Sequence, residues 1–294
     1  MAAAESALQL RGGGRVRRRR IVNRIMEGLA TVAALLAVAI LGIVVLSVLR
    51  RGASQLSWGF LTGSLPTFGE TGGGIAPLII GSAILVGIAT AVALPLGVLT
   101  ALFTSEFAPR RVAPVIRLTL DLMNGLPSIV IAVFIYGLLV TGRGQSGWAG
   151  GLALSIVMFP LVARSTQEVL RLVPASLREG AMAMGVSRWR MITGIVLPAS
   201  LGGIVTGGVL ALARAAGETA PLLFASSVFA NTIVWDPRQA LPNMPVQIFI
   251  WSESPDPEDH KRAWATAFVL LVFVLLASLV ARAALARRRR KLGR

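Results

Sequence analysis

Long uncharged, apolar stretches alternate with short charged segments along most of the chain. A helix needs about 20 apolar residues to cross the hydrocarbon core of a bilayer. The apolar stretches reach that length six times, and the predicted membrane-spanning helices are 26–49, 75–103, 114–141, 148–168, 198–226 and 264–285. The pattern therefore predicts an all-α, polytopic membrane protein with six transmembrane helices.

The first apolar stretch has a cleavable signal peptide as its alternative interpretation. Its 22 uncharged residues, Gly28 to Leu49, exceed an h-region of about 7–15 residues. No clear small-residue cleavage site follows before Arg50. We therefore expect an uncleaved first span.

The composition agrees with a membrane protein. Of the 294 residues, 55% are hydrophobic and 14% are charged, whereas an ordinary soluble domain is about a quarter charged. A disordered chain would be far less hydrophobic, and a compact soluble enzyme would need more polar surface. The chain has no Cys and one His, which excludes a disulfide framework and argues against a zinc or haem site.

The basic residues predict the orientation of the spans. With the N-terminus inside, the inner segments carry 22 of the 29 Lys and Arg residues and the outer segments carry 6. Basic residues favour the cytoplasmic side, so both termini are expected in the cytoplasm, although Arg50 and Arg51 oppose the rule locally. The basic ends flank membrane spans, where anionic lipids attract them by about 1 kcal/mol per residue. We therefore expect contact with the lipid bilayer and no nucleic-acid binding.

The same pattern divides the chain into segments. The expected segments are a basic cytoplasmic N-terminus (1–25), a first transmembrane helix with an extracytoplasmic loop (26–74), a core with five transmembrane helices (75–285) that contains a cytoplasmic loop at 169–198, and a basic cytoplasmic tail (286–294).

Covalent or nucleotide chemistry is not expected in this chain. A phosphate-cradling GxxxxGK[ST] loop needs a Lys followed by Ser or Thr, but Lys261 and Lys291 precede Arg and Leu. Any ATP-driven action must therefore use a separate subunit, and the chain itself needs no cofactor. The acids of the last outer loop, which are Glu253, Asp256, Glu258 and Asp259, have a divalent-cation site as one interpretation. A solvated loop is favoured, because the segment contains prolines and lacks the glycine-punctuated calcium loop.

The cytoplasmic segment before the fifth span predicts a short helix across the end of the bundle. Pro174 interrupts the preceding helix, and Ser176 with Glu179 has the spacing of a capping box. Gly185 is placed to end this helix in a left-handed conformation. Leu177, Ala181 and Met184 are expected near one face, Ser187 is expected to start a further amphipathic turn, and Pro198 suits the first turn of the next span. A helix of this length fits a groove on a partner protein, and capping and docking are both open roles for Glu179.

This segment resembles the EAA motif of bacterial ABC importer permeases, EAA-x3-G-x9-I-x-LP. The matching residues are Glu179, Gly180, Ala181, Gly185, Ile195, Leu197 and Pro198. Gly180 replaces the first Ala, at a cost of about 1 kcal/mol in helix propensity. The resemblance implies the type I importer permease fold. It also implies that Ser176, Glu179, Gly180, Ala181 and Gly185 belong to a coupling helix that docks on the ATP-binding subunit.

A charged pair lies inside the fifth predicted span. Arg214 and Glu218 are four residues apart, so they share one helix face and can pair. A charge at the bilayer centre costs about 2.5–3.5 kcal/mol, which favours a position facing the bundle interior or a wet pathway. The fork of an arginine suits a tetrahedral oxyanion. A structural, internally neutralised pair is the alternative. Small residues on the same helix are expected to allow close packing, and they are Gly203, Gly207, Ala211 and Ala215.

The third span carries a second special sequence, Gly125 to Val130. Pro127 cannot donate a backbone hydrogen bond and Gly125 weakens the helix nearby. Two interpretations remain: a simple kink, or a break in the helix that exposes polar backbone. A break would suit a substrate path. Asn124 and Ser128 are candidates to satisfy the freed backbone groups. Nearer the cytoplasm, Arg117 and Asp121 are expected to form an ion pair.

A narrower resemblance covers about residues 70–285. The run Arg214 to Phe224 reads RAAGETAPLLF and is similar to the PstA-type permeases of phosphate importers, as are GLPSIV and VPASLREGAMAMG. The resemblance implies a permease for inorganic phosphate in the bacterial inner membrane, with Arg214, Glu218, Thr219, Asn124 and Ser128 along the path. The implied partners are a PstC-type permease, two PstB-type subunits that bind ATP and Mg, and an extracytoplasmic PstS-type phosphate-binding protein. The outer loop 227–262, with Trp235 and Trp251 as expected interfacial anchors, would face that binding protein. A permease for sulfate or molybdate is the alternative.

Overall fold

The protein is described here by a computed structural model that covers residues 14–67, 72–228 and 230–292. Within these ranges every regular element is helical. The chain divides into two compact units, Met1–Arg50 and Arg51–Arg294. The first unit contains most of α1 (Gly14–Ala53). Its run Val16–Ala53 is long and apolar enough to cross a membrane, and its large apolar side chains are mostly exposed, as expected for a helix surrounded by lipid.

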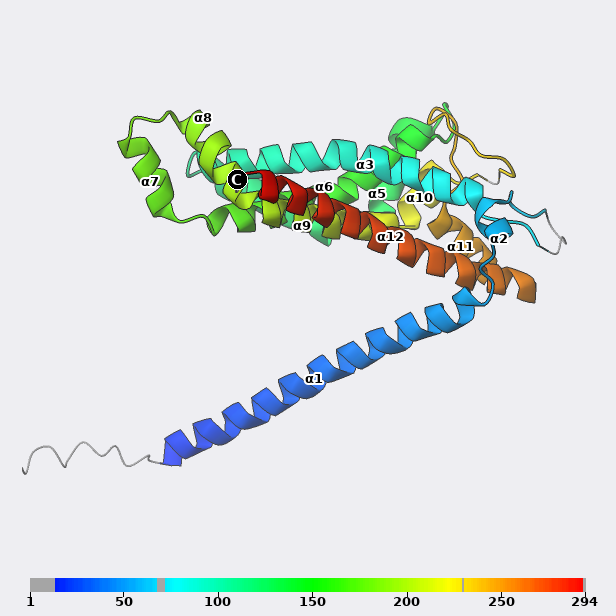
Figure 1. Ribbon diagram of the computed structural model, residues 1–294, viewed down its shortest axis with the longest axis horizontal. Coiled ribbons are helices and arrows are strands. Elements are labelled where there is room, and N and C mark those ends of the chain that lie inside the picture. Colours follow the sequence, from blue (N-terminus) through cyan, green and yellow to red (C-terminus); the bar gives the residue numbers. More distant parts are fainter. Residues whose placement is uncertain (1–13, 68–71, 229, 293–294) are drawn as a thin grey trace, which may run out of the picture. The chain divides into compact units, whose positions relative to one another are not determined.

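The second unit is a bundle of long helices with short elements at both ends (Figure 1). The long helices are α3 (Ala76–Leu102), α6 (Gly147–Arg171), α9 (Leu197–Ala216) and α12 (Pro257–Leu292). The shorter helices are α2 (Trp58–Thr62), α4 (Val112–Gly125), α5 (Ser128–Ile135), α7 (Ala175–Ala183), α8 (Arg188–Met191), α10 (Ala220–Ala225) and α11 (Met244–Ser252). Three π-helical turns continue α3, α5 and α8, and they are η2 (Phe103–Phe107), η3 (Tyr136–Val140) and η4 (Ile192–Val196).

The prediction of a multi-pass, all-α membrane protein is confirmed. Five described helices are long and apolar enough to cross a membrane, and the number is six if the bent pair α4 and α5 counts as one span. The limits of two spans differ from the prediction. The fifth begins at Arg188 and ends at Ala216, and the sixth lies within a helix that starts at Pro257.

The early start of the fifth span has a local cause. Pro198 lacks an N–H, and its ring crowds the carbonyl four residues earlier, which would break a regular α-helix. The π-helical turn η4 ends at Val196, directly before α9. A π turn changes the hydrogen-bond register, so the helix can continue from α8 through η4 into α9. Pro198 lies at the start of α9, as predicted.

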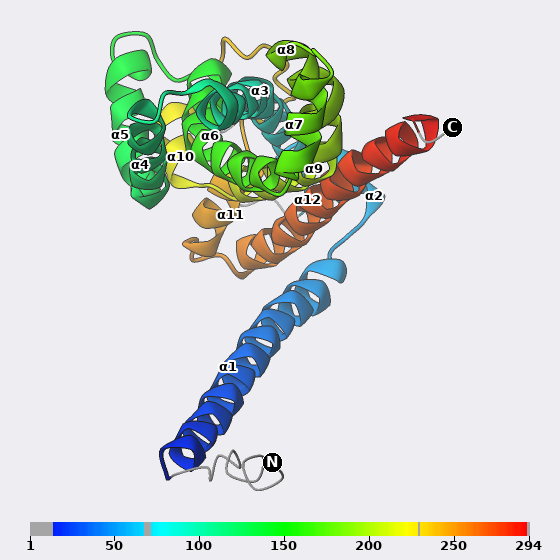
Figure 2. The same ribbon diagram turned by 90° about the vertical axis from the view of Figure 1, so that its left-hand side faces the viewer.

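Helix α6 is the centre of the bundle and packs against α3, α9, α4, α5 and α10 (Figure 2). The predicted small-residue stripe on α9 makes this packing close. A Cβ on Gly203 would lie 2.4 Å from Val169, and a Cβ on Gly207 would lie 2.2 Å from Ser165. Ala211 and Ala215 are fully buried. The packing role predicted for this stripe is confirmed, because nothing larger than hydrogen fits at either glycine.

The last outer loop is an ordered structure tied to the bundle. Asn243 caps the start of α11 by accepting a hydrogen bond from the Val246 backbone, and it donates to the Ser226 carbonyl oxygen at 2.8 Å. Ser82 of α3 accepts from the Met244 backbone at 2.9 Å. Trp251 is buried in the core, whereas Trp235 is exposed. The prediction of two interfacial Trp anchors is therefore wrong for Trp251, because α11 turns that ring inward.

Arg51, which opposes the positive-inside rule, has a specific partner. Its guanidinium lies 5.0 Å from the centre of the Trp264 ring. A cation over an aromatic face is stabilised by the ring's electrons. This contact accounts for a basic residue on the side that the other charges disfavour.

We expect Gly203→Ala to destabilise the isolated chain, because the added methyl would overlap Val169. Overpacking of this kind costs about 1–3 kcal/mol. Gly194→Ala is the matched control in the same continuous helix, since its Cβ meets nothing within 4 Å. Thermal unfolding of the detergent-purified chain should show a lower midpoint for Gly203→Ala alone. Equal midpoints in the two variants would contradict the close packing of α9 on α6.

Candidate coupling helix and translocation path

Helix α7 lies across one end of the bundle, with α8 beside it and the last turns of α12 at the same end (Figure 1). Gly185 ends it with φ of +75°, as predicted. The Gly185 N–H donates to the Met182 carbonyl at 3.0 Å, and the Val186 N–H donates to the Ala181 carbonyl at 3.2 Å. These two bonds form a Schellman motif, which satisfies carbonyls that the helix end would leave free.

The predicted capping box at the start of α7 is wrong. The helix begins at Ala175 with Pro174 at the capping position, and no side chain caps it within the described structure. Ser176 is already inside the first turn, so its backbone is helical and its hydroxyl is not placed to cap. Glu179 is the fifth residue of α7, too far along to reach the capping position. A capping role for Glu179 is therefore excluded.

The faces of α7 separate a buried side from a free side. Ala181 is 8% exposed and belongs to an apolar cluster with Leu170 and Met191. Ser176, Glu179 and Gly180 are exposed. Leu177 and Met184, which were expected near the same face as Ala181, are 48% and 83% exposed in the isolated chain. The structure thus presents Ser176, Glu179 and Gly180 outward, while Ala181 holds the helix to the bundle and Gly185 ends it.

The sequence analysis missed Arg178, which is the most connected residue of this helix. Its guanidinium donates to the backbone carbonyls of Val173 at 2.7 Å and Leu170 at 2.8 Å. It also forms an ion pair of 3.1 Å with Glu106 of η2, whose side chain is 6% exposed. The sequence signals that could have suggested this ion pair are an isolated acid at the end of the second span, Glu106, and an arginine next to the motif residue Glu179.

The third span is broken rather than gently kinked. Helices α4 and α5 meet at Leu126 and Pro127 with an angle of 95° between them. Asn124 precedes this break and Ser128 follows it, and both are partly exposed. Among the described residues neither side chain hydrogen-bonds the freed backbone, so that expectation is wrong; the Leu126 N–H instead donates to the Met123 carbonyl at 3.3 Å.

The predicted fifth span, 198–226, is not a single helix, because the observed span ends at Ala216 and a break follows it. Helix α9 ends at Ala216, Gly217 caps it, and α10 starts at Ala220. Arg214 is in the last turn of α9, while Glu218 and Thr219 lie in the break. The local reason is the sequence Gly-Glu-Thr-Ala-Pro, since glycine weakens a helix and a proline is favoured in the first turn of a new one.

The two breaks lie on neighbouring elements. Helix α10 packs against α5 (Figure 2), so the segments that follow the two breaks are side by side. Ala215, next to Arg214, packs with Ala93 and Met158, which lie in the middle of α3 and α6. Arg214 is therefore about halfway along the bundle. Unwound backbone at membrane depth is tolerated where it is covered by protein or lines a wet cavity.

Arg214 and Glu218 pair across the end of α9. The Arg214 Nε lies 3.6 Å from the Glu218 Oε1, and the two side chains are 49% and 17% exposed. A cation in the last turn also interacts favourably with the helix dipole. The charge of Arg214 is therefore partly neutralised by Glu218, while the rest of its guanidinium stays accessible. That arrangement allows an oxyanion to approach the guanidinium without facing a bare charge.

The expected Arg117–Asp121 pair does not form. Asp121 instead accepts a hydrogen bond of 2.7 Å from Arg164 of α6, and Arg164 also donates to Gln167 at 3.2 Å. The Nε of Arg117 is buried without a hydrogen-bond partner among the described residues. Asp121 therefore ties α4 to α6 rather than stabilising its own helix.

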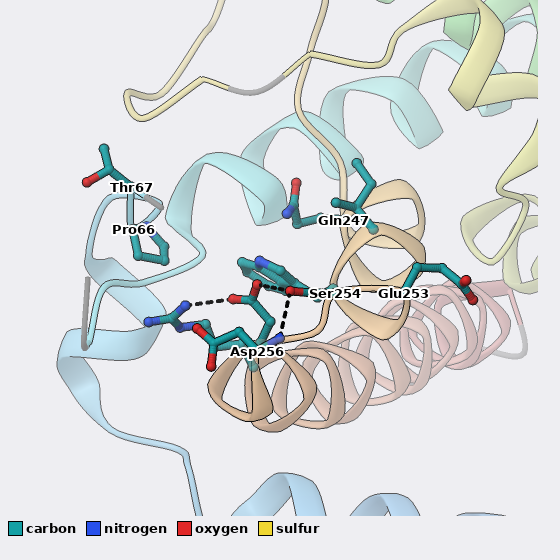
Figure 3. Close-up of a pocket in the computed structure, with 10 residues that line it drawn as sticks. Pro66, Thr67, Gln247, Glu253, Ser254 and Asp256 are labelled. Carbon is teal, nitrogen blue, oxygen red and sulfur yellow. Dashed lines mark hydrogen bonds and ion pairs between the residues drawn. The ribbon is translucent and has the colours of Figure 1, made fainter. Parts of the chain in front are cut away.

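A cavity of about 460 Å³ lies at the outer end, far in sequence from Arg214 (Figure 3). Two of the carboxylates that line it have local partners: Asp259 accepts from Arg262 and Ser254 at 2.7 Å each, and Asp256 accepts from the Glu258 backbone N–H at 2.9 Å. The Glu258 side chain, outside the cavity lining, accepts from Lys261 at 2.6 Å. The predicted solvated loop is wrong here, because Glu258 and Asp259 lie in the first turn of α12, where acids interact favourably with the helix dipole.

Known proteins show clear similarity to this chain. Residues 93–291 match the family described as binding-protein-dependent transport system inner membrane component. A phosphate transport system permease protein PstA from Yersinia pestis is 38% identical, covering 92% of each chain. PstA from Haemophilus influenzae is 36% identical over 90% of this chain and 94% of its own length. The crystal structure of a bacterial ABC transporter that imports alginate has a chain with TM-score 0.63 at 17% identity, covering 91% of this chain and 99% of that one. This last match shows a shared fold alone.

The two glycines of the EAA motif should respond oppositely to alanine. Gly185→Ala forces a side chain into a left-handed conformation and should destabilise the chain by about 1–2 kcal/mol. Gly180→Ala places its Cβ in open space inside α7 and should stabilise that helix by up to about 1 kcal/mol. Thermal unfolding midpoints of the two purified variants provide the comparison. Similar shifts of the same sign would contradict the helix end described above.

Proposed function

The chain belongs to the family of inner membrane components of binding-protein-dependent transport systems, and we propose that its cargo is inorganic phosphate. It is a permease subunit of an ATP-driven phosphate importer, a transport subunit rather than an enzyme. The observation that carries the cargo is the similarity to PstA permeases over nearly the whole chain, together with an accessible arginine halfway along the bundle. The sulfate or molybdate alternative is not favoured.

Arg214 is the proposed contact for phosphate during its passage. Its planar fork donates two hydrogen bonds to one oxyanion, and the paired Glu218 keeps the site from trapping an anion. Glu218 also favours phosphate over sulfate, because hydrogen phosphate has an O–H that can donate a hydrogen bond to a carboxylate and sulfate has none. The Thr219 hydroxyl at the same break, and Asn124 and Ser128 at the neighbouring break, supply further polar groups along the proposed path.

A single chain forms half of this path. Arg214 is 49% exposed in the isolated chain, a position that would be very costly against lipid. We propose that a homologous PstC-type permease covers this side and completes the path. We also propose that the outer loops face a PstS-type phosphate-binding protein and that the assembly lies in the bacterial cytoplasmic membrane, with both termini of this chain inside.

ATP hydrolysis is proposed to act through the outward face of α7. The chain contains no GxxxxGK[ST] loop, so two PstB-type subunits would bind ATP and Mg. Ser176, Glu179 and Gly180 form the exposed face that would dock on such a subunit. Glu179 has no capping role, which leaves docking as the better explanation for a free carboxylate at this position.

Arg214→Ala should lower phosphate uptake in cells that lack their own importer and receive all partner subunits. A hydrogen bond to a charged group contributes about 1.5–3 kcal/mol, so we expect uptake to fall about ten- to a hundredfold. Arg24→Ala, which removes an exposed arginine from α1, is the matched control. If Arg214→Ala takes up phosphate as fast as the control, with equal amounts of protein in the membrane, Arg214 has no role in the pathway.

Glu179→Ala should reduce co-purification of the ATP-binding subunit and the ATPase activity stimulated by the binding protein. Loss of one interfacial charged contact costs about 2–5 kcal/mol, enough to release most of the subunit. Glu253→Ala removes an exposed acid at the outer end and should leave co-purification unchanged. If Glu179→Ala retains both the subunit and its stimulated activity, α7 does not dock through this carboxylate.

A further inference from the structure

Helix α7 has no rigid backbone connection to the helices on either side. Pro174 separates it from α6, and Gly185, with φ of +75°, separates it from α8. A push on α7 therefore cannot travel along a continuous helix. Side-chain contacts have to carry the movement into the bundle, and Ala181 alone buries little surface.

Arg178 makes the polar contacts that can carry this load. One guanidinium spans the carbonyl oxygens of Leu170 and Val173, at the end of α6, and the carboxylate of Glu106, in η2. The side chains of Arg178 and Glu106 are 22% and 6% exposed. A carboxylate this buried is stable only while its cation stays beside it. The two residues must therefore move together.

A second contact joins the same π-helical turn to α8. The Arg188 guanidinium lies 5.2 Å from the centre of the Phe107 ring. Residues 106 and 107 of η2 are thus held by arginines from both sides of the Gly185 hinge. The turn η2 continues directly from α3, the helix that packs along α6 and also contacts α9.

We propose that Glu106 and Arg178, supported by Arg188 on Phe107, form a clasp that makes α7 and α3 move as one body. Glu106 and Arg178 are positioning residues that link ATP-driven movement of α7 to the helices around the path. This inference rests on the proposed function, because it takes α7 as the part on which the ATP-binding subunit acts.

The functional test uses the complete transporter in proteoliposomes, with phosphate uptake and stimulated ATPase measured on the same preparation. Glu106→Gln should keep the ATP-binding subunit bound and the ATPase active, while phosphate imported per ATP falls about five- to tenfold, within the usual range of coupling factors. Glu106→Asp should recover part of that ratio. Glu27→Gln, which removes an exposed acid from α1, should match the wild type.

An unchanged ratio of phosphate to ATP in Glu106→Gln would overturn the clasp. This includes a parallel fall of uptake and ATPase, because a merely structural pair would lower both and keep their ratio constant. If Glu106→Gln does not assemble, Arg178→Lys decides, because lysine keeps the charge but cannot span three acceptors. Its ratio should also fall.

A distance measurement tests the clasp without reference to the cargo. The chain has no Cys, so spin labels can be placed at Leu99→Cys in α3 and Met182→Cys in α7, both exposed positions. The transporter with the wild-type clasp should give one narrow distance distribution with and without ATP and vanadate. Adding Glu106→Gln should broaden or shift it between these states. If the distance distribution in Glu106→Gln equals that of the wild type in both nucleotide states, the clasp is overturned. A wild-type transporter that imports no phosphate would instead contradict the proposed function and leave this readout valid.

Discussion

The backbone of a membrane protein has to satisfy its own hydrogen bonds, because hydrocarbon offers none. This constraint explains why the described elements are helices and why interruptions carry information. The backbone breaks at Leu126–Pro127, within the third span, and at Gly217–Thr219, directly after the fifth span. The segments that follow these breaks, α5 and α10, pack against each other. Polar backbone is therefore gathered on neighbouring elements, beside the arginine that lies halfway along the bundle.

Close packing holds the rest of the bundle firm around these breaks. Lipid tails are as apolar as leucine, so helices associate through fit rather than through water exclusion. Gly203 and Gly207 let α9 approach α6 until their hydrogens meet Val169 and Ser165. Buried polar groups do the same at the outer end, where Asn243 and Ser82 anchor α11. A firm bundle is what allows a local push at one end to reach the middle.

The charges of this chain serve three separate purposes. The basic ends and the basic loops between spans are expected to orient the spans, and they say little about cargo. Arg178 and Arg164 are structural in their geometry, since each joins helices that are far apart in sequence, through Glu106 and Asp121. Arg214 differs from both, because it stays half exposed while paired with Glu218 of its own segment. Its position, and not the net charge of the chain, is what makes it the candidate for contact with an anion.

The sequence by itself determined the membrane class, the number of spans, the left-handed end of α7 at Gly185 and the packing stripe on α9. These follow from local rules: apolar length, backbone freedom and the spacing of small residues. Tertiary structure alone decided the partner of Asp121, the inward turn of Trp251 and the ion pair of Arg178 with Glu106. Each of these depends on which helix lies opposite. Residues 72 positions apart, such as Glu106 and Arg178, carry no periodic signal that links them, because only the folded bundle brings their ends together.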